Sequence, residues 1–437
     1  MNLPRGQKPF VVGLAGLGTV GGGLVRLLEE NAELTRLRAG RDIVVKRILV
    51  RDAAKAREVS PPADAELTTD AAALTDDPEI DALAELIGGI DQARALIDRA
   101  LDKGKHVVTA NKALLAEDGL ALFKKAENNN LVLRCEAAVA GAIPIVQTMK
   151  ESLTGNRVTS LLGILNGTSN YILSEMTTGN LDFDTALKQA QELGYAEADP
   201  SLDIDGHDAA HKLILLIRLA HGVDYPYATL PVSGIRGISV MDIRLAEEFG
   251  YHIKLIGRVR EVADTRGGMS LEAGVFPALV HNRYLLARVN GVYNAIRVEA
   301  NAAGSLFFHG RGAGALPTAG AALSDLVAAA RGAPADNTGF ARPDLPQAAV
   351  LPWEDGRSSF YVRLTVRDRP GVLRDLAGAM AAEEISVAQM IQKSGEGGIV
   401  PLVFMTHETT TRAMNKSLER MRDAGLLTEP AVCHRVL

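Results

Sequence analysis

One stretch of the sequence gathers the side chains best suited to moving a proton. An apolar run that ends near Ala220 is preceded by five titratable residues, namely Asp205, His207, Asp208, His211 and Lys212. In a helix, Asp205, Asp208 and Lys212 fall on one stripe that continues as leucines, so we expect these charged groups to face the interior. A lysine at the edge of a core, beside carboxylates, can donate or accept a proton, and oxidation of an alcohol needs such a group.

Two other interpretations of this helix are weaker. Asp208 and Lys212 could form a surface ion pair worth only about 0.3–0.5 kcal/mol, but the apolar continuation of their stripe argues against that. His207 and His211, which we expect on the adjacent, more polar side with Arg218, enclose an aspartate in the order His-Asp-Ala-Ala-His. A zinc hydrolase would carry glutamate at the second position and a third ligand elsewhere. We therefore favour proton transfer over zinc binding.

A glycine-rich loop near the start of the chain predicts a dinucleotide site. Gly16, Gly18 and Gly21 form the pattern Gly-x-Gly-x-x-Gly between an apolar strand and an amphipathic stretch. The first glycine permits a tight turn, the second lets backbone N–H groups approach a pyrophosphate, and the third lets the helix pack on the strand. The alternative, a glycine-rich turn with no ligand, is disfavoured by the flanking strand and by the helix N-terminus, which attracts anions.

The end of the second predicted strand bears on the choice between NAD and NADP. An acidic residue there bonds the ribose hydroxyls, whereas an arginine pairs with a 2′-phosphate. The sequence reads Val50-Arg51-Asp52, with Lys55 and Arg57 close behind. Arg51 favours NADP, and Asp52 would favour NAD if the register shifted by one residue. We expect NADP, with use of NAD left open.

The composition is that of a globular protein without a nucleic-acid or membrane partner. The chain has 437 residues, 47% of them hydrophobic and 23% charged, with a formal net charge of −6. At about 100–200 residues per domain, roughly two to four domains fit this length. There is no basic field for nucleic acid, and no apolar run approaches the roughly 18 residues of a membrane span. Two distant cysteines and the lack of a signal-peptide core predict a cytoplasmic protein.

The spacing of apolar residues divides the chain into domains. Residues 1–134 alternate strands and helices, which predicts a doubly wound parallel sheet of the Rossmann type. Residues 135–309 switch to glycine-interrupted strands mixed with longer helices and predict a second, α+β domain. Residues 331–356 contain four prolines and little periodicity, which is typical of a linker. Residues 357–437 predict a βαββαβ unit.

Six sequence blocks go beyond these general patterns. They are GLGTVGGG (16–23), VVTANKA (107–113), EAAVAGAIP (136–144), LNGTSNYIL (165–173), GYAEADPSLDIDGHDAAHK (194–212) and GRGAGALPT (310–318). Together they resemble homoserine dehydrogenases over residues 13–331. The resemblance implies interconversion of L-homoserine and L-aspartate 4-semialdehyde with a nicotinamide cofactor, in threonine, methionine and isoleucine biosynthesis. We further expect residues 135–309 to bind substrate and to dimerise, and residues 310–330 to pack back on the first domain.

The same resemblance implies roles for individual residues. Lys212 would be the proton donor and acceptor, and Glu197 and Asp208 would hold the polar groups of the substrate, whose ammonium suits acidic residues. Lys112 would contact the nicotinamide and the substrate and would either assist proton transfer as a second catalytic lysine or bind the substrate carboxylate. It follows the carboxyl end of a parallel strand, where such sheets bind ligands. Capping of that strand's loop is the alternative for Lys112. Besides the three loop glycines and Arg51, the expected cofactor contacts are Thr19, Val20, Gly194 and Gly310.

The resemblance also implies a monovalent cation site, expected to hold Na⁺. Its ligands would be the carboxylate of Glu136 and the backbone carbonyls of Val139, Gly141 and Ile143. Oxygen ligands on a glycine-containing loop suit a hard cation. From spacing alone, a hinge loop with a satisfied glutamate is an equal alternative.

The C-terminal unit carries Asp-Arg-Pro-Gly at 368–371, after its first strand, and resembles ACT regulatory domains. Such domains pair and bind amino acids near this turn. We therefore expect feedback inhibition by L-threonine and assembly as a homodimer or homotetramer. A dimerisation module that has lost its ligand is the alternative.

Two rival functions are weaker than the dehydrogenase. An aspartate-semialdehyde dehydrogenase would need a cysteine nucleophile, and neither Cys135 nor Cys433 has the expected surroundings. A non-catalytic amino-acid sensor would not need both Lys112 and Lys212. No kinase segment precedes the glycine loop, so we do not expect a fused bifunctional enzyme.

Overall fold

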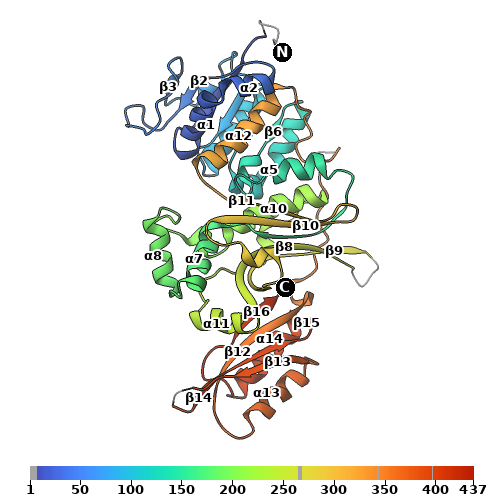
Figure 1. The fold of residues 1–437 in the computed structure, drawn as a ribbon. Helices are drawn as coiled ribbons and strands as arrows, with labels where there is room; N and C mark the ends of the chain where they lie inside the picture. The colour runs from blue at the N-terminus through green and yellow to red at the C-terminus, as the bar shows by residue number, and fades with distance from the viewer. Residues whose placement is uncertain (1–6, 264–267, 342–343, 396) are drawn as a thin grey trace.

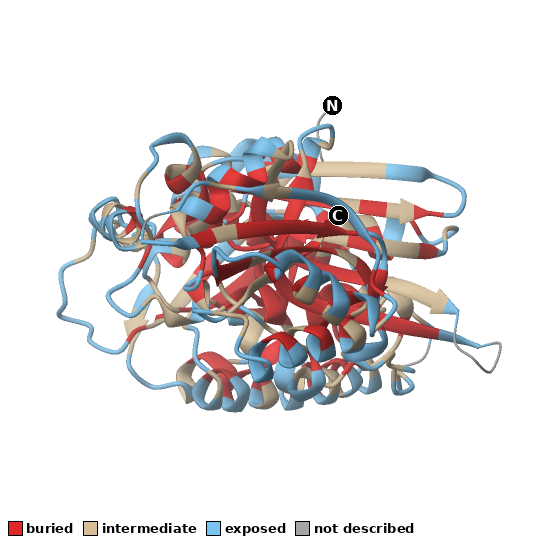
Figure 2. Ribbon diagram, turned by 90° about the horizontal axis from the view of Figure 1, so that it is seen from below, coloured by how far each residue is buried: buried red, intermediate tan, exposed pale blue. Residues whose placement is uncertain are grey.

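The computed structural model describes residues 7–263, 268–341, 344–395 and 397–437, which form three parts arranged along one long axis (Figure 1). The N-terminal part lies at one end and the C-terminal part at the other. Seen along that axis, buried residues gather in the interior, and a row of partly exposed helices lies along one side (Figure 2). No helix among the described residues is long and apolar enough to cross a membrane.

A six-stranded parallel sheet forms the N-terminal part, in the order β3-β2-β1-β4-β5-β6. Its strands are β1 (Phe10–Ala15), β2 (Ile43–Leu49), β3 (Glu66–Thr68), β4 (Ala82–Glu85), β5 (His106–Thr109) and β6 (Leu133–Arg134). Both β1 and β4 are buried along their whole length, as expected for strands covered on two faces. The strand order reverses between them, and ligands of such sheets bind beyond the carboxyl ends at that point. The predicted Rossmann-type sheet is confirmed.

The helices around this sheet include one from much later in the chain. Those of the N-terminal region are α1 (Thr19–Glu30), α2 (Ala32–Ala39), α3 (Ala72–Thr75), α4 (Asp91–Asp102) and α5 (Lys112–Asn128). They are joined by α12 (Ala315–Ala330), drawn in orange beside the blue α1 (Figure 1). The two backbones are so close that a Cβ on Gly23 would lie 2.7 Å from the carbonyl oxygen of Ala315. The apolar residues of α12 therefore share the core of the N-terminal part.

An antiparallel sheet and several helices form the middle part. The strands run in the order β11-β10-β7-β8-β9 and are β7 (Val158–Ile164), β8 (Tyr251–Ala263), β9 (Met269–His281), β10 (Tyr293–Ala300) and β11 (Gly304–Arg311). The longer helices are α7 (Gly167–Thr178), α8 (Phe183–Glu192), α10 (His207–His221) and α11 (Val240–Glu248). Shorter helical turns are η1 (Glu136–Ala138), α6 (Ile145–Gln147), η2 (Thr148–Ser152), α9 (Ser201–Ile204), η3 (Tyr227–Thr229) and η4 (Leu285–Arg288). Because α10 contacts both α5 and β8, it links the N-terminal part to this sheet.

Within the proline-containing segment 331–356, residues 346–351 run along the middle part. The N–H of Asp224 donates to the carbonyl of Pro346, and the N–H of Leu271 donates to that of Ala349. The segment ends in the short turn η5 (Trp353–Asp355). Backbone hydrogen bonds therefore hold residues 346–351 against Asp224 and the start of β9.

The C-terminal part has the predicted βαββαβ order, and this expectation is confirmed. Its elements are β12 (Arg357–Arg367), α13 (Val372–Ala381), β13 (Val387–Gln392), β14 (Ile399–Thr406), α14 (Thr411–Asp423) and β16 (Val432–Val436). A two-residue strand, β15 (Thr409–Thr410), pairs with the start of β12.

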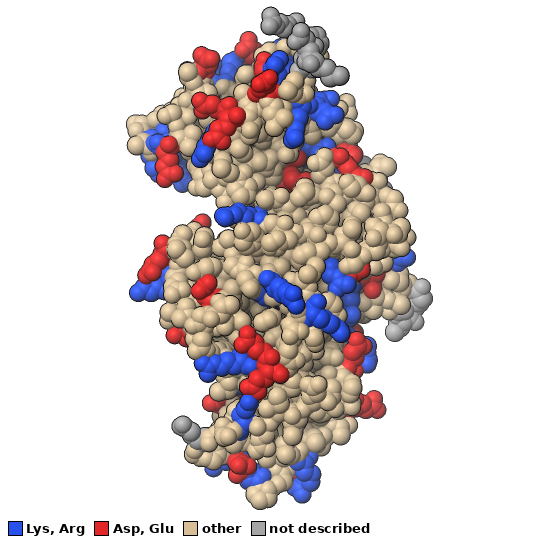
Figure 3. Space-filling model, in the orientation of Figure 1, with Lys and Arg blue, Asp and Glu red and all other residues tan. Residues whose placement is uncertain are grey.

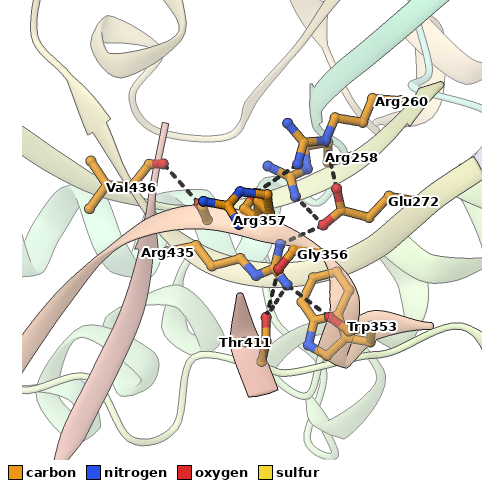
Figure 4. Close-up of polar contacts among 10 residues, drawn as sticks. Arg258, Arg260, Glu272, Trp353, Gly356, Arg357, Thr411, Arg435 and Val436 are labelled. Atoms are coloured by element: carbon orange, nitrogen blue, oxygen red, sulfur yellow. Dashed lines mark hydrogen bonds and ion pairs between the residues drawn. The ribbon is translucent and has the colours of Figure 1, made fainter. Parts of the chain in front are cut away.

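The middle and C-terminal sheets are joined, which we did not anticipate from the sequence. β16 pairs in parallel with β9, with Arg435 opposite Ala278, so one ten-stranded sheet runs through both parts. Close to this pairing, the buried carboxylate of Glu272 accepts hydrogen bonds from Arg258, Arg260 and Arg435 (Figure 4). The last strand of the chain therefore attaches the C-terminal part to the middle sheet.

Candidate active site

The helix α10 positions the lysine and the aspartate of the predicted stripe. Gly206 precedes it in the left-handed region (φ 90°), a conformation that favours glycine. The side chains of Asp208 and Lys212 are 8% and 9% exposed, one turn apart on the helix. Asp205 lies before the boundary and pairs with Arg236 near the surface, so its predicted place on the inward stripe is wrong. The turn at Gly206 is the reason, because it ends the helical geometry there.

Asp208 is the centre of the charged cluster. Its Oδ2 accepts a hydrogen bond from Lys212 Nζ at 2.7 Å, and its Oδ1 lies 3.1 Å from Lys112 Nζ. Burial opposes the carboxylate, but the two ammonium groups more than offset it and hold the pKa of Asp208 below its usual range. In turn, Asp208 raises the pKa of Lys112. The ion pair between Asp208 and Lys112 joins α10 to the first residue of α5, across two parts of the molecule.

Two polar residues that we did not assign from the sequence complete this cluster. The Nδ2 of Asn166 donates to Asp208 Oδ2 at 2.7 Å and to Asp203 Oδ1 at 2.6 Å. Burial and the nearby charge of Asp208 raise the pKa of Asp203. Asn166 also caps α7, because its Oδ1 accepts from the N–H of Ser169. An asparagine before a helix is a readable cap, but the carboxylates that its amide reaches depend on the fold.

Lys212 uses two of its three N–H donors on the protein. One goes to Asp208, and another goes to the backbone carbonyl of Leu165 at 2.7 Å. The same carbonyl accepts a hydrogen bond from Asn294 Nδ2 at 3.0 Å. In the part of the chain that the structure describes, the third N–H has no partner, which leaves it free for a substrate oxygen.

The remaining side of α10 is less polar than we expected. His207 is exposed, with Nδ1 2.9 Å from the hydroxyl of Tyr227. His211, however, is buried against the Tyr227 ring, and Arg218 is buried with its guanidinium donating to two carbonyls of α5. Burial lowers the pKa of His211 to about 4. Among the described residues, no group of three or more His, Cys, Asp or Glu side chains is placed to hold a metal ion, so the zinc interpretation gains no support.

The glycine loop lies between β1 and α1, where the strand order reverses. Gly16 has φ 97°, and a Cβ there would lie 2.8 Å from the carbonyl oxygen of Leu86. A Cβ on Gly21 would lie 2.0 Å from the carbonyl oxygen of Gly16, so this position requires glycine. Gly18, by contrast, has nothing within 4 Å of an added Cβ. No side chain caps the first turn of α1, so its N–H groups and the open space at Gly18 suit a pyrophosphate.

A buried hydrogen-bond network fixes the carboxyl ends of β4 and β5, next to this loop. The fully buried carboxylate of Glu85 accepts from the hydroxyl of Thr109 at 2.5 Å and from two backbone N–H groups of the following loop. Burial raises the pKa of Glu85. Asn111 then caps α5, whose first residue is Lys112. We did not identify Glu85 from the sequence, where its segment, Ala-Leu-Ala-Glu, stood out only as less β-branched than a usual core strand.

The other predicted contacts lie in loops and at element ends. Glu197 and Gly194 are exposed after α8, and the charge of Glu197 contributes to the raised pKa of Lys112. Gly310 is near the end of β11, where an added Cβ would lie 3.1 Å from the side chain of Ile143. Thr19 and Val20 are the first residues of α1.

The surface is hollowed between the N-terminal and middle parts, with basic side chains at the hollow (Figure 3).

Arg51 and Arg57, which follow β2, make different side-chain contacts. Arg51 is exposed, and no described residue bonds its side chain. Arg57 instead turns back and donates to carbonyls of its own loop, including those of Asp52 and Lys55. Arg51 is therefore the one of these two arginines that is free to meet a ligand.

The predicted cation ligands lie between β6 and α6. The buried carboxylate of Glu136 accepts hydrogen bonds at 2.9 and 2.8 Å from two N–H groups of α6. The carbonyl of Ile143 accepts from the N–H two residues further on. The carbonyls of Val139 and Gly141 accept no hydrogen bond from the described residues. Ala140 and Gly141 both have left-handed backbones, with φ 55° and 56°.

Comparison with known proteins identifies the family. A family model for the homoserine dehydrogenase NAD binding domain matches residues 16–136, a homoserine dehydrogenase model matches residues 144–327, and an ACT domain model matches residues 360–425. A homoserine dehydrogenase of Pseudomonas aeruginosa is 40% identical over 441 residues, with 98% of this chain and 99% of that one covered.

Solved structures agree with these matches. The crystal structure of a homoserine dehydrogenase from Thiobacillus denitrificans superposes with a TM-score of 0.92 at 41% identity and covers 98% of both chains. A hyperthermophilic archaeal homoserine dehydrogenase in complex with NADPH superposes with a TM-score of 0.60 at 25% identity, over 74% of this chain and 98% of that one. This chain therefore belongs to the homoserine dehydrogenase family of NAD(P)-dependent oxidoreductases, in the form that carries a C-terminal ACT domain.

Proposed function

We propose that Lys212 exchanges a proton with the substrate hydroxyl in the interconversion of L-homoserine and L-aspartate 4-semialdehyde. The observation that carries this proposal is the buried ammonium, held by Asp208 and the Leu165 carbonyl with one N–H left free. In the reduction direction the ammonium of Lys212 protonates the carbonyl oxygen, and in the oxidation direction the neutral amine, left by loss of that proton, takes the hydroxyl proton. A nicotinamide cofactor whose pyrophosphate the glycine loop holds would supply the hydride chemistry.

The charges around Lys212 suit an amino-acid substrate. L-Homoserine carries an ammonium and a carboxylate besides its hydroxyl. Asp208 and the exposed Glu197 supply negative charge for the ammonium, and Lys112, whose side chain is 40% exposed, supplies a cation for the carboxylate. This arrangement supports Glu197, Asp208 and Lys112 as substrate-binding groups, with Lys112 also beside the nicotinamide.

A homoserine-dependent assay tests this function directly. We expect formation of NADPH or NADH at alkaline pH, proportional to added enzyme and dependent on L-homoserine. Absence of turnover in folded protein that still binds the cofactor would contradict the proposal. The rival aspartate-semialdehyde dehydrogenase is disfavoured, because burial raises the pKa of the Cys135 and Cys433 thiols to about 12 and so suppresses a thiolate nucleophile.

We infer that NADP is the preferred cofactor. The free side chain of Arg51 at the end of β2 is placed where a 2′-phosphate is recognised in such folds, and the archaeal relative was solved with NADPH. Titration of both cofactors in the homoserine assay tests this. We expect Arg51→Gln to raise the KM for NADP⁺ and to leave that for NAD⁺ nearly unchanged.

We propose that Glu136 and the carbonyls of Val139, Gly141 and Ile143 surround a monovalent cation, Na⁺. The support is that two of these carbonyls have no hydrogen bond from the described residues, on a loop whose left-handed backbone redirects them. Activity measured in Na⁺, K⁺ or tetramethylammonium salts at equal ionic strength tests the site. Equal activity in all three would contradict it.

We propose that the C-terminal domain binds L-threonine as a feedback inhibitor. Its match to the ACT family model supports binding of an amino-acid effector, and the turn 368–371 leads directly into α13. L-Threonine added to full-length enzyme should lower activity, and Asp368→Ala in this turn should weaken the inhibition without changing basal activity. Insensitivity of the unmodified enzyme would leave only the dimerisation alternative.

We propose that the enzyme is a homodimer or a homotetramer in which a second copy covers the middle sheet. A hollow of about 420 Å³ on this sheet is lined by Leu162, Phe307 and Leu285, of which Leu285 is 61% exposed, together with four arginines. Apolar exposure of this kind is typical of subunit contacts. Light scattering should report more than one copy, and Leu285→Asp should reduce the assembly.

A further inference from the structure

Asn294 lies behind the proposed proton-transfer group, although no sequence motif pointed to it. It is fully buried on β10, opposite Gly310 of β11. Its Nδ2 donates to the carbonyl of Leu165 at 3.0 Å, and Lys212 Nζ donates to the same oxygen at 2.7 Å. A carbonyl oxygen has two lone pairs, so Asn294 and Lys212 can each donate to one of them.

The amide of Asn294 reduces the stability of the core that contains it. Its Oδ1 is buried, and no described residue donates a hydrogen bond to it. Turning the amide over would only place Oδ1 against the Leu165 oxygen, with two acceptors facing each other. A buried unpaired acceptor costs about 1–3 kcal/mol, so an apolar side chain of similar shape would be more stable here. The amide is therefore better explained by its donor than by packing.

The surroundings hold this donor in one position. β10 is paired with β11 on one side and with β7 on the other, which fixes the backbone. The Asn294 side chain is also held by packing. A Cβ on Gly312 would lie 2.2 Å from Asn294 Oδ1, so the Gly312 backbone packs directly on the amide. The direction of the N–H toward Leu165 is set by these contacts.

We propose that Asn294 is a positioning residue for Lys212. By occupying one lone pair of the Leu165 carbonyl, Asn294 fixes the direction from which the ammonium approaches the other. The two bonds of Lys212, to this carbonyl and to Asp208, then aim its third N–H at the substrate oxygen. This inference rests on the role proposed for Lys212 and extends it to a residue that touches neither substrate nor cofactor.

The substitution Asn294→Leu removes the donor and the unpaired acceptor together. We expect kcat for homoserine oxidation to fall roughly 10- to 100-fold, because a misplaced proton-transfer group loses its alignment. The KM for the cofactor should stay within about twofold, and Tm should be unchanged or higher because the unpaired acceptor is gone. If the leucine variant does not fold, Asn294→Ser, which removes volume instead, is expected to show the same loss of kcat.

Asn170 provides a matched control. It is 1% exposed on α7, and its Nδ2 donates to the carbonyls of Val289, Gly291 and Tyr293, with no bond to Lys212. Asn170→Leu should lower Tm and leave kcat of the folded enzyme close to normal, the opposite of Asn294→Leu.

The outcomes separate this inference from the proposed function. Near-normal kcat in Asn294→Leu, together with an inactive Lys212→Met, would overturn the inference and leave the role of Lys212 intact. Loss of kcat accompanied by lower Tm and weaker cofactor binding would show a structural role and would also overturn it. An active Lys212→Met would instead remove the proposed function on which the inference rests.

Discussion

At the scale of single residues, one carboxylate serves several partners. Asp208 is bonded by Lys212, by Lys112 and by the amide of Asn166. Removing Asp208 would leave two ammonium groups facing each other without their shared anion, so its loss would disturb the whole cluster. Removing Lys212 leaves Asp208 still neutralised by Lys112 and bonded by Asn166. Lys212 is therefore the residue whose chemistry can be tested with the least structural damage.

Lys212→Met keeps the length and the apolar stem of the side chain and removes its N–H groups. We expect kcat to fall roughly 10²- to 10⁴-fold, the usual contribution of a general acid or base, while the affinity for NADPH measured by fluorescence stays nearly unchanged. The exposed Lys188, on α8, provides the control Lys188→Met, which should be fully active. Normal turnover in Lys212→Met would refute the assigned role.

Gly18→Ala separates folding of the glycine loop from binding of the cofactor. The backbone of Gly18 has φ −92°, which alanine adopts readily, and nothing lies within 4 Å of the added methyl group. We expect an unchanged Tm without cofactor but at least roughly tenfold weaker binding of NADPH, because the methyl group occupies space that a pyrophosphate needs. Gly237→Ala, also in open space but in another loop, should change neither quantity. Undiminished affinity in Gly18→Ala would argue against this site.

His211 gives the stability of the fold a dependence on pH. Because burial lowers its pKa to about 4 from the ordinary histidine value of about 6.5, the full stability is present above pH 6.5 and is lost as the pH falls toward 4. His211→Phe retains a ring against Tyr227 but has no group to protonate. Over this pH range its free energy of unfolding should fall less than that of the unmodified enzyme, with a difference of at most about 3 kcal/mol. Urea unfolding at about pH 7 and about pH 5 measures the difference. His207→Phe, at the exposed start of the same helix, is the control. An equal loss of unfolding free energy between the two pH values in His211→Phe and in the unmodified enzyme would contradict the expectation.

The residues that could be predicted from the sequence are those related by local period. Asp208 and Lys212 are one helical turn apart, so their common stripe was readable. Asn166 precedes Asp208 by 42 positions, and nothing in its own segment indicates which carboxylates its amide meets. His211 and Arg218 were placed on a polar side because their types are polar, whereas docking of α5 buries them. The burial of these side chains and the partners of Asn166 are therefore set by contacts between elements, which the local sequence pattern does not specify.

At the scale of elements, α11 carries the second attachment of the C-terminal part. The buried carboxylate of Asp242 accepts hydrogen bonds from the hydroxyl of Tyr361 at 3.0 Å and from the guanidinium of Arg363, both on β12. Burial opposes this carboxylate, but the hydrogen bonds from Arg363 and its neighbours hold the pKa of Asp242 below its usual range. An exposed ion pair between Glu248 and Lys393 lies at the same interface.

Asp242→Ala should weaken this attachment strongly. It leaves the Arg363 guanidinium and the Tyr361 hydroxyl without their acceptor, which typically costs about 3–5 kcal/mol for a buried charge. Glu248→Ala breaks only the exposed pair, whose partners are 44% and 41% exposed, and should cost less than about 1 kcal/mol. Denaturant unfolding of the two variants measures both costs. Similar effects from the two substitutions would contradict this view of the interface.

At the scale of the whole molecule, the sequence indicated the parts but not the way they are joined. The alternation of strands and helices, the glycine loop and the C-terminal βαββαβ order were all local patterns, and the structure bears them out. The pairing of β16 with β9 joins segments that are far apart in the sequence, and the residues of either strand would suit any sheet edge. Such a pairing can therefore be recognised only in the folded structure.

This pairing changes what a shortened chain can show about regulation. A chain ending at Gly356 would lose β16, leave Ala278 and Leu279 of β9 without their partner strand, and remove Arg435 from the buried Glu272. Asp242 would lose its two partners on β12 as well. We expect this chain to unfold at a clearly lower temperature and to aggregate, so insensitivity to L-threonine in it would say nothing about the effector site. A shortened enzyme with normal Tm and activity would contradict this expectation and would show that the joined sheet is dispensable for catalysis.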